Sequence, residues 1–218
     1  MWSVIESEAD HGDWPDSPPP PWPAEVRATI WWHRATAAGR ELLPEASLPV
    51  TVAMVVDYAS SPVGPYREIL ASPTLRRPGG GHGKLPRLAV PFIAVDSDRS
   101  VHGGRTHWQL PKVLADFDGD VLGESRAEGP DWSVATTASR RGPTFPMKGG
   151  IGFSQPVDDE FLIAGSRLTG KARLCRVTVD AQGPTLGSWL KSGTHLGLQI
   201  VSGKMTTGPS RLVTVPED

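Results

Sequence analysis

Residues 48–70 read LPVTVAMVVDYASSPVGPYREIL, and this stretch decides the fold class. Its first part, Leu48 to Tyr58, is rich in β-branched valine and carries no charge before Asp57, which is typical of a β-strand. The serine, proline and glycine residues that follow are turn formers, so Tyr66 to Leu70 is predicted to be a partner strand.

The rest of the chain continues this pattern of short apolar runs between turn residues. Residues 26–33 alternate with a period of two, which predicts a half-buried strand with Val26, Ala28, Ile30 and Trp32 on one face. Further strands are predicted at Leu88 to Asp96, Trp132 to Ser139, Phe161 to Leu168, Ala172 to Val179, Leu196 to Val201 and Arg211 to Val215.

Two short helices interrupt these strands. Ala35 to Leu43 is rich in Ala, Glu and Leu and ends at Pro44, and Asp96 to Trp108 has a candidate N-cap in Ser97 or Asp98. The 24 Gly and 22 Pro among 218 residues also favour short strands and turns over long helices. The sequence therefore predicts a mainly β protein, a barrel or a sandwich, with a few short helices.

The chain divides into an arm and a single domain. Residues 1–23 form a Pro/Trp-rich N-terminal arm of extended polyproline geometry, in which Trp14 and Trp22 could anchor the arm on the core or on a partner subunit. Residues 24–218 have a length that suits one domain.

Composition excludes several classes of function. The 22 basic and 24 acidic residues leave a net charge of −2, without the basic excess that binding to nucleic acid requires. No apolar run approaches the roughly 20 residues that span a bilayer, and the first residues lack the apolar stretch of a signal peptide. A single cysteine, Cys175, excludes an internal disulfide and a Cys-rich zinc site. We therefore expect a cytoplasmic protein that binds neither nucleic acid nor membrane.

Two motifs fail on inspection. Gly79 to Lys84 lies in a glycine-rich loop that resembles a phosphate loop, but Pro78 stands at the first required glycine and Leu85 replaces the hydroxyl residue. His102 and His107 are five residues apart, so they would not share a helix face as a metal-binding pair. We expect no metal and no cofactor.

A single lysine lies in the apolar segment 108–115, WQLPKVLA. If the residues around Lys112 are packed, its amine loses water, and burial disfavours the charged form. A neutral amine can attack a carbonyl carbon and form a Schiff base. The alternative is that the Lys112 stem lies along the surface and its charge stays in water. These residues alone favour that alternative.

Two segments of the sequence resemble segments of the acetoacetate decarboxylase family, and they occur in the same order as in that family. The segment Gly104 to Leu114, GRTHWQLPKVL, is similar to that family's Gly-Arg…Pro-Lys-Lys segment. The segment Tyr58 to Glu68, YASSPVGPYRE, resembles its strand, turn and strand that end in an active-site glutamate. The likeness covers Pro20 to Phe117. It implies a mainly β, acetoacetate decarboxylase-like barrel that assembles into a homo-oligomer.

The resemblance also implies roles for individual residues. Lys112 would be the Schiff-base nucleophile and Glu68 the nearby acid/base. Arg105 belongs to the matched motif, with either substrate contact or a structural role at a helix end, and Arg27 lies close to where the family has a pocket arginine. Trp108 and Met54 are candidate lining residues, together with Phe92, although core packing explains each of these three equally well.

The sequence departs from the family at two positions. Val113 stands where the family has a second lysine, and Ala53 where it has an acidic residue. A neighbouring cation, which helps to keep the family's lysine neutral, is therefore missing. Burial alone can supply the roughly 5 kcal/mol that an uncharged amine needs near neutral pH, so amine activation survives the change.

Three functions are compatible with these residues. The leading hypothesis is a Schiff-base lyase that decarboxylates a small oxo acid of the acetoacetate type through Lys112. The first alternative is an aldolase or dehydratase that acts on a keto acid with the same lysine. The second alternative is a non-catalytic small-ligand binding protein on the same fold.

Overall fold

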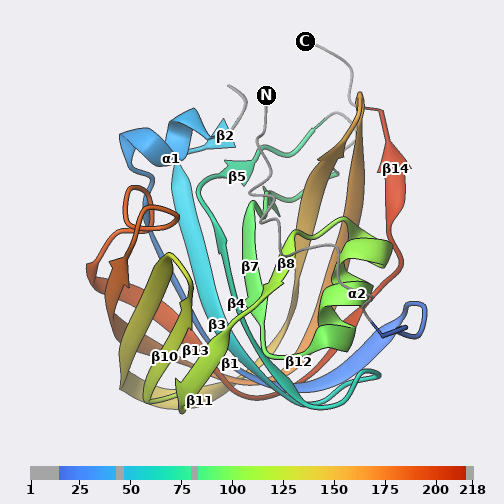
Figure 1. The fold of residues 1–218 in the computed structure, drawn as a ribbon. Helices are drawn as coiled ribbons and strands as arrows, with labels where there is room; N and C mark the ends of the chain where they lie inside the picture. The colour runs from blue at the N-terminus through green and yellow to red at the C-terminus, as the bar shows by residue number, and fades with distance from the viewer. Residues whose placement is uncertain (1–14, 43–46, 80–82, 215–218) are drawn as a thin grey trace.

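The structure is a computed structural model that describes residues 15–42, 47–79 and 83–214. Strands dominate it; of the two helices, α2 (Asp98–Trp108) lies against the sheet and α1 (Ala37–Glu41) lies in the connection beyond the end of β1 (Trp22–Arg34) (Figure 1). The strands are β1 (Trp22–Arg34), β2 (Ser47–Leu48), β3 (Val50–Ser60), β4 (Tyr66–Ser72), β5 (Leu75–Arg76), β6 (Arg87–Leu88), β7 (Phe92–Val95), β8 (Lys112–Leu114), β9 (Asp116–Gly119), β10 (Glu124–Gly129), β11 (Trp132–Val157), β12 (Glu160–Gln182), β13 (Gly193–Thr207) and β14 (Arg211–Val213).

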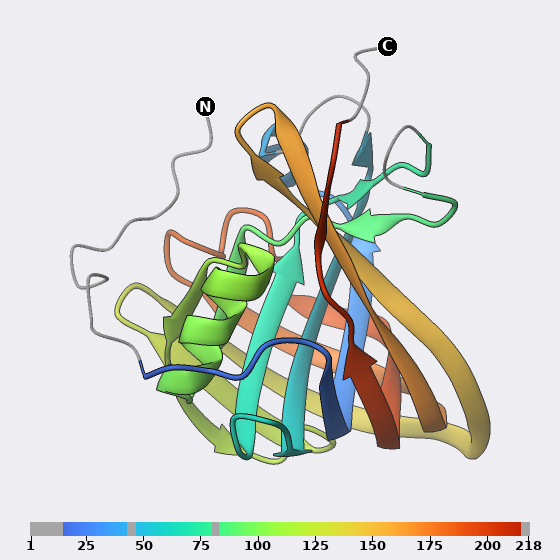
Figure 2. The same cartoon turned by 90° about the vertical axis from the view of Figure 1, so that its right-hand side faces the viewer.

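All fourteen strands belong to one strongly curved sheet. Its order is β2-β5-β6-β11-β12-β13-β1-β3-β4-β7-β8, while β10 pairs with β11 and β9, and β14 pairs with β12. Most neighbouring strands are antiparallel, but β7 and β8 are parallel. Parallel neighbours need a crossover connection, and α2 provides it, so this helix lies against the sheet next to the start of β8 (Figure 2).

The sheet buries side chains on both faces. On one face of β1, Val26 and Ala28 belong to the first core cluster and Ile30 packs against it. On the opposite face, Trp31 belongs to the second core cluster. The strands β11 and β12 are long enough to contribute to both clusters. For example, Val134 packs in the second cluster and Phe153, on the same strand, in the first.

These observations confirm the predicted fold class, which is mainly β with two short helices. The predicted strand at Leu48 to Tyr58 corresponds to β3, and the predicted helix at Asp96 to Trp108 to α2, with Ser97 as its N-cap. The predicted strand at Leu88 to Asp96 is split into β6 and β7 around Pro91, whose ring removes a backbone donor.

Two other expectations differ from the structure. Trp32 was predicted to be buried and Trp31 to lie on the opposite, polar face, but Trp31 is fully buried and Trp32 is 38% exposed. The reason is that the opposite face of β1 also carries a core. The two strands predicted at 161–168 and 172–179 form a single strand, β12, because Gly170 between them allows close approach of the Ser202 carbonyl instead of forming a turn.

The described part of the predicted arm, residues 15–21, runs past α2 before entering β1 (Figure 2). Trp22, the first residue of β1, packs edge-to-face on Trp108 of α2, with ring centroids 4.9 Å apart. Gly103 leaves the room for the Trp22 ring, because a Cβ there would collide with it. Trp22 thus anchors this segment on its own chain. Residues 1–14, the predicted helix end at Pro44, the middle of the 79–83 loop and Val215 lie outside the described residues.

In the described ranges, neither helix is long and apolar enough to cross a bilayer.

Candidate active site

The centre of the candidate site is a buried ion pair between two strands. Lys112 is the first residue of β8, and Glu68 lies on β4, with β7 between them in the sheet. Lys112 Nζ lies 2.7 Å from Glu68 Oε2, and each residue is only 3% exposed. Lysine and glutamate are almost never this buried unless they are paired. Lys112 therefore does not lie along the surface, which was the alternative left open by its sequence context.

The C-terminal end of α2 determines the position of Lys112. Gln109 adopts a left-handed conformation with φ 52°, and the Leu110 N–H bonds back to the Gly104 carbonyl at 3.0 Å. This arrangement ends the helix and turns the chain sharply. Arg105 Nε then donates to the Lys112 carbonyl at 2.8 Å, which fixes the backbone of the lysine.

Two further residues of α2 contact the lysine side chain. Ser100 accepts a hydrogen bond from Lys112 Nζ at 2.9 Å. Gly104 packs so closely against the lysine stem that a Cβ at this position would overlap Lys112 Cδ. The helix therefore supplies both a polar partner for the amine and the space for its side chain.

Two tyrosines complete the cluster around Glu68. Tyr58 donates its hydroxyl hydrogen to Glu68 Oε1 at 3.1 Å, and its ring stacks on that of Tyr66 with 4.2 Å between centroids. The Tyr66 ring centroid lies 5.3 Å from Lys112 Nζ, within cation–π range. Burial raises the pKa of Tyr58 and of Tyr66 well above 10, and the nearby Glu68 raises both further. Both tyrosines therefore stay protonated, and Tyr58 donates its hydrogen bond to Glu68.

The contact between Lys112 and Glu68 suits proton transfer. At 2.7 Å, a proton can move from the ammonium to the carboxylate without changing the net charge of the buried site. The two side chains are thus in direct hydrogen-bond contact inside the protein.

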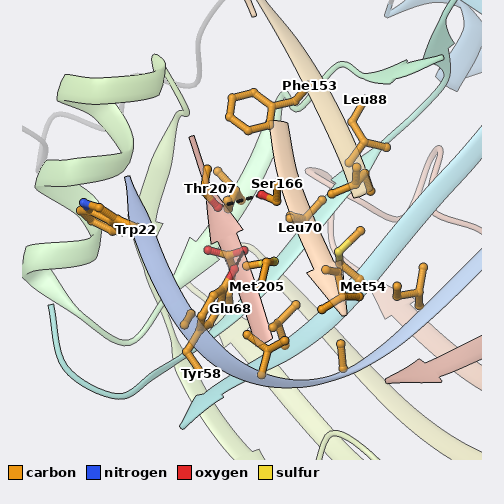
Figure 3. A pocket seen from close by; sticks show the side chains of 18 of the residues that line it. Trp22, Met54, Tyr58, Glu68, Leu70, Leu88, Phe153, Ser166, Met205 and Thr207 are labelled. Carbon is orange, nitrogen blue, oxygen red and sulfur yellow. Dashed lines mark hydrogen bonds between the residues drawn. The ribbon is translucent and has the colours of Figure 1, made fainter. Parts of the chain in front are cut away.

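Both residues of this pair line a cavity of about 250 Å³, and Figure 3 shows Glu68 among the side chains of its wall. Its size is close to the lower end of the roughly 300–1,000 Å³ of small-molecule sites. The wall is mainly apolar and comes from strands far apart in the sequence. Met54, Leu70, Leu88, Phe153 and Met205 belong to it. The cavity has room for a small molecule next to Lys112.

The structure brings four of the six predicted site residues to this cavity. Lys112, Glu68, Trp108 and Met54 all line it. Phe92, which we also considered as a lining residue, instead packs edge-to-face on Trp132 in the second core cluster.

The two predicted arginines do not belong to the lining of this cavity. Arg27 lies on the opposite face of β1, where it binds Asp57 at 2.6 Å and Asp120 at 3.3 Å. The hydrogen bond with Asp57 raises the pKa of Arg27. Substrate contact by Arg27 does not fit this position, because alternation along β1 directs Val26 and Ala28 into the cavity instead. Arg105 holds the Lys112 backbone, which matches the structural role.

Sequence reasoning missed several residues of the site. Ser100 gave no signal, since a serine in a helix has no distinctive spacing. Tyr58 and Tyr66 were part of the matched segment, but only their cross-strand pairing shows that they surround Glu68. Ser166 and Thr207 join the cavity from β12 and β13, whose contribution follows only from the closed sheet.

No cluster of three or more His, Cys, Asp or Glu side chains suited to a metal ion occurs in the part of the chain that the structure covers.

Comparisons with known proteins identify the fold. No protein-family model matches the chain, and no curated protein sequence matches it either. The three-dimensional architecture, however, is that of the acetoacetate decarboxylases, as the sequence resemblance predicted.

Individual solved structures support this match over nearly the whole chain. Acetoacetate decarboxylase from Legionella pneumophila superposes with a TM-score of 0.67 and 14% identity, covering 99% of this chain and 97% of that one. Another acetoacetate decarboxylase gives a TM-score of 0.64 at 14% identity, covering 100% of both chains. The enduracididine biosynthesis enzyme MppR, in complex with the condensation product of pyruvate and imidazole 4-carboxaldehyde, gives 0.59 at 14% identity, covering 90% of each.

Proposed function

We propose that this protein is an enzyme in which Lys112 forms a Schiff base with a small carbonyl compound and Glu68 transfers the protons. The observation that carries this proposal is the 2.7 Å contact between Lys112 Nζ and Glu68 Oε2 inside an enclosed, mainly apolar cavity. A nucleophile, its acid/base partner and a place for the reacting carbon occur together there.

The reaction begins when the Lys112 proton moves to Glu68. The neutral amine attacks the carbonyl carbon, and the carbonyl oxygen takes up protons and leaves as water, so that a C=N bond replaces the C=O bond. The protonated imine then accepts the electron pair of a neighbouring bond and becomes an enamine. Protonation of the enamine, followed by hydrolysis of the imine, releases the product and restores Lys112.

Two reactions can proceed through this enamine. In decarboxylation of a β-keto acid, the bond to the carboxylate breaks and carbon dioxide leaves. The apolar wall supports this reaction, because it destabilises a carboxylate more than neutral carbon dioxide. In an aldol-type reaction, the enamine attacks a second carbonyl compound. The MppR complex with a condensation product on this fold supports the second reaction.

We further propose distinct roles for the remaining predicted residues. Trp108 and Met54 would contact the substrate, since both line the cavity. Arg105 would position Lys112 through its backbone carbonyl.

Reductive trapping tests the proposal. The protein is incubated with acetoacetate or pyruvate and with borohydride, and the modified residue is identified by mass spectrometry. We expect a stable adduct on Lys112 and none in Lys112→Arg, which keeps a cation beside Glu68 but removes the nucleophilic amine. Lys148→Arg, at an exposed lysine, is the matched control and keeps the adduct. Glu68→Gln is expected to slow adduct formation by about 10² to 10⁴-fold.

The products separate the candidate functions. Release of carbon dioxide identifies a decarboxylase, and consumption of an added aldehyde identifies an aldolase. If no carbonyl compound modifies Lys112, the Schiff-base proposal is wrong and the non-catalytic binding protein becomes the better description.

A further inference from the structure

The lining of the cavity contains one pair of opposite charges and no further charge. Lys112 and Glu68 are its only ionisable Lys, Arg, Asp or Glu side chains within the described residues, and each is already the partner of the other. The rest of the wall consists of apolar side chains, aromatic rings and a few hydroxyl groups.

None of the other lysines and arginines of the chain lines the cavity. The sequence segments outside the described ranges contain no lysine and no arginine, so all 22 of these residues lie in the part of the chain that the structure shows. Arg27 binds two aspartates on the opposite face of β1, and Arg105 holds the Lys112 carbonyl. Neither guanidinium lies in the cavity wall.

This charge balance disfavours a substrate that carries a free carboxylate. Once Lys112 becomes a protonated imine, Glu68 still balances its charge, so a substrate carboxylate would be a second anion facing a single cation. An unpaired carboxylate in an apolar site is costly. A small oxo acid also has few remote groups whose binding could offset this cost.

A neutral carbonyl compound fits the same wall. Its apolar part gains free energy from burial against the aliphatic side chains. The indole N–H groups of Trp22 and Trp108 donate to backbone carbonyls of Pro18 and Gly208, so these rings present apolar surface.

One polar contact is open to such a ligand. The Ser166 and Thr207 hydroxyl groups lie 2.7 Å apart in the cavity wall (Figure 3). One hydrogen between them makes their mutual bond, which leaves the other hydroxyl hydrogen for a second acceptor. This pair can therefore donate to an uncharged oxygen.

We infer that the substrate of Lys112 is an uncharged aldehyde or ketone with an apolar substituent, rather than a free oxo acid. The inference rests on the proposed Schiff-base function and names its substrate class. It also favours the aldol-type reaction over decarboxylation of a free β-keto acid.

A matched pair of ketones tests the inference on the unmodified protein. The ion 4-oxopentanoate and its methyl ester contain the same ketone and differ in the charge at the far end. Each is titrated with borohydride present, and the Lys112 adduct is measured by intact mass. We expect half-maximal labelling by the ester at a concentration at least about tenfold below that of the acid, a difference of 1.4 kcal/mol.

The outcomes separate the two proposals. Equal labelling, or stronger labelling by the acid, would overturn the substrate class and leave the Schiff-base function intact. Labelling of Lys112 by neither compound, nor by the oxo acids named above, would overturn both.

A charge-insertion variant gives a second test. Met54 lines the cavity, so Met54→Arg places a guanidinium in its wall and should lower the concentration of 4-oxopentanoate needed relative to the ester. Met54→Leu keeps the wall apolar and should retain the preference for the ester. A folded Met54→Arg variant with an unchanged preference would contradict the electrostatic argument. Should this variant not fold, the titration of the unmodified protein decides alone.

Discussion

At the scale of single residues, Gly104 makes the Lys112 geometry possible. It lies in the last turns of α2, and the lysine stem passes directly over it on the way to Glu68. In an ordinary helix interior, replacing glycine by alanine stabilises the helix by about 1 kcal/mol. At this position a methyl group would occupy the space of the lysine stem.

We therefore expect Gly104→Ala to move the Lys112 amine away from Glu68. Borohydride trapping should fall by about tenfold or more, because small displacements of a nucleophile carry large costs. Thermal unfolding should occur at a lower temperature than in the unmodified protein, in spite of the better helix propensity of alanine. Mass spectrometry and a melting curve measure the two effects.

Thr106→Ala is the control on the same helix, since Thr106 is exposed and does not touch the lysine. It should leave trapping unchanged. A Gly104→Ala variant that is more stable and traps ligand normally would show that the lysine stem has room to spare.

At the scale of elements, the sequence predicted strands best where one physical signal dominated. The valine-rich β3 and the capped helix α2 were both predictable, because composition and capping are local properties. The continuity of β12 was not, because Gly170 has the same appearance in sequence whether it makes a turn or admits a neighbouring strand. The exposure of Trp32 depends on which face of β1 the second core covers.

The residues of the candidate site were likewise predictable only where a local signal in the sequence marked them. Lys112 and Glu68 could be proposed from their resemblance to a family segment, and the sheet brings them together across β7. Predicting the orientation of Arg27 required a strand register accurate to one residue, because neighbouring residues of a strand point to opposite faces. Predicting that Ser166 and Thr207 line the cavity required knowledge of how the sheet closes, because they lie on β12 and β13.

His33 links β1 to the loop before β13 and makes this contact sensitive to pH. On β1, its Nδ1 lies 2.9 Å from the Arg34 carbonyl, and its Nε2 accepts from the Lys191 N–H at 3.1 Å. These bonds require the neutral ring. Burial lowers the pKa of His33 below 6.5, and nearby His195 and Lys191 lower it further.

The sign of the pH effect follows from this shift. As pH falls below 6.5, the unfolded chain binds a proton at His33 more readily than the native protein, so the free energy of unfolding decreases. We expect this decrease between about pH 7 and 5.5, above the range where carboxylates titrate. Urea unfolding at several pH values measures it.

His33→Gln should reduce this dependence, because the glutamine carbonyl can accept from Lys191 without a titrating group. His195→Gln, at the half-buried neighbouring ring, is the comparison. A pH dependence that is unchanged in His33→Gln would assign the effect to another group.

At the scale of the whole molecule, an apolar strip crosses three adjacent strands. It consists of Trp32 on β1, Leu196 opposite it on β13 and Leu174 on β12, and all three side chains are exposed. Exposed apolar patches commonly mark interfaces between proteins. The homo-oligomer predicted from the family resemblance would have a suitable contact surface here.

We predict that light scattering gives a mass that is a multiple of 23.4 kDa. Leu196→Glu, which places a charge in the apolar strip, should shift the protein toward the monomer. Leu85→Glu, at a leucine that is more exposed and lies outside the strip, should not. A monomer mass for the unmodified protein would contradict the prediction.

The pairing of β1 with both β3 and β13 has a consequence for biosynthesis. The β1–β3 contact can form early, whereas β13 (Gly193–Thr207) is synthesised long after both of these strands. Until then one edge of β1 lacks its hydrogen-bonding partner, and the cavity wall stands open to water. A ribosome-bound nascent chain would thus present an unpaired, apolar strand edge, the kind of surface that aggregates or engages chaperones before the last strands are made.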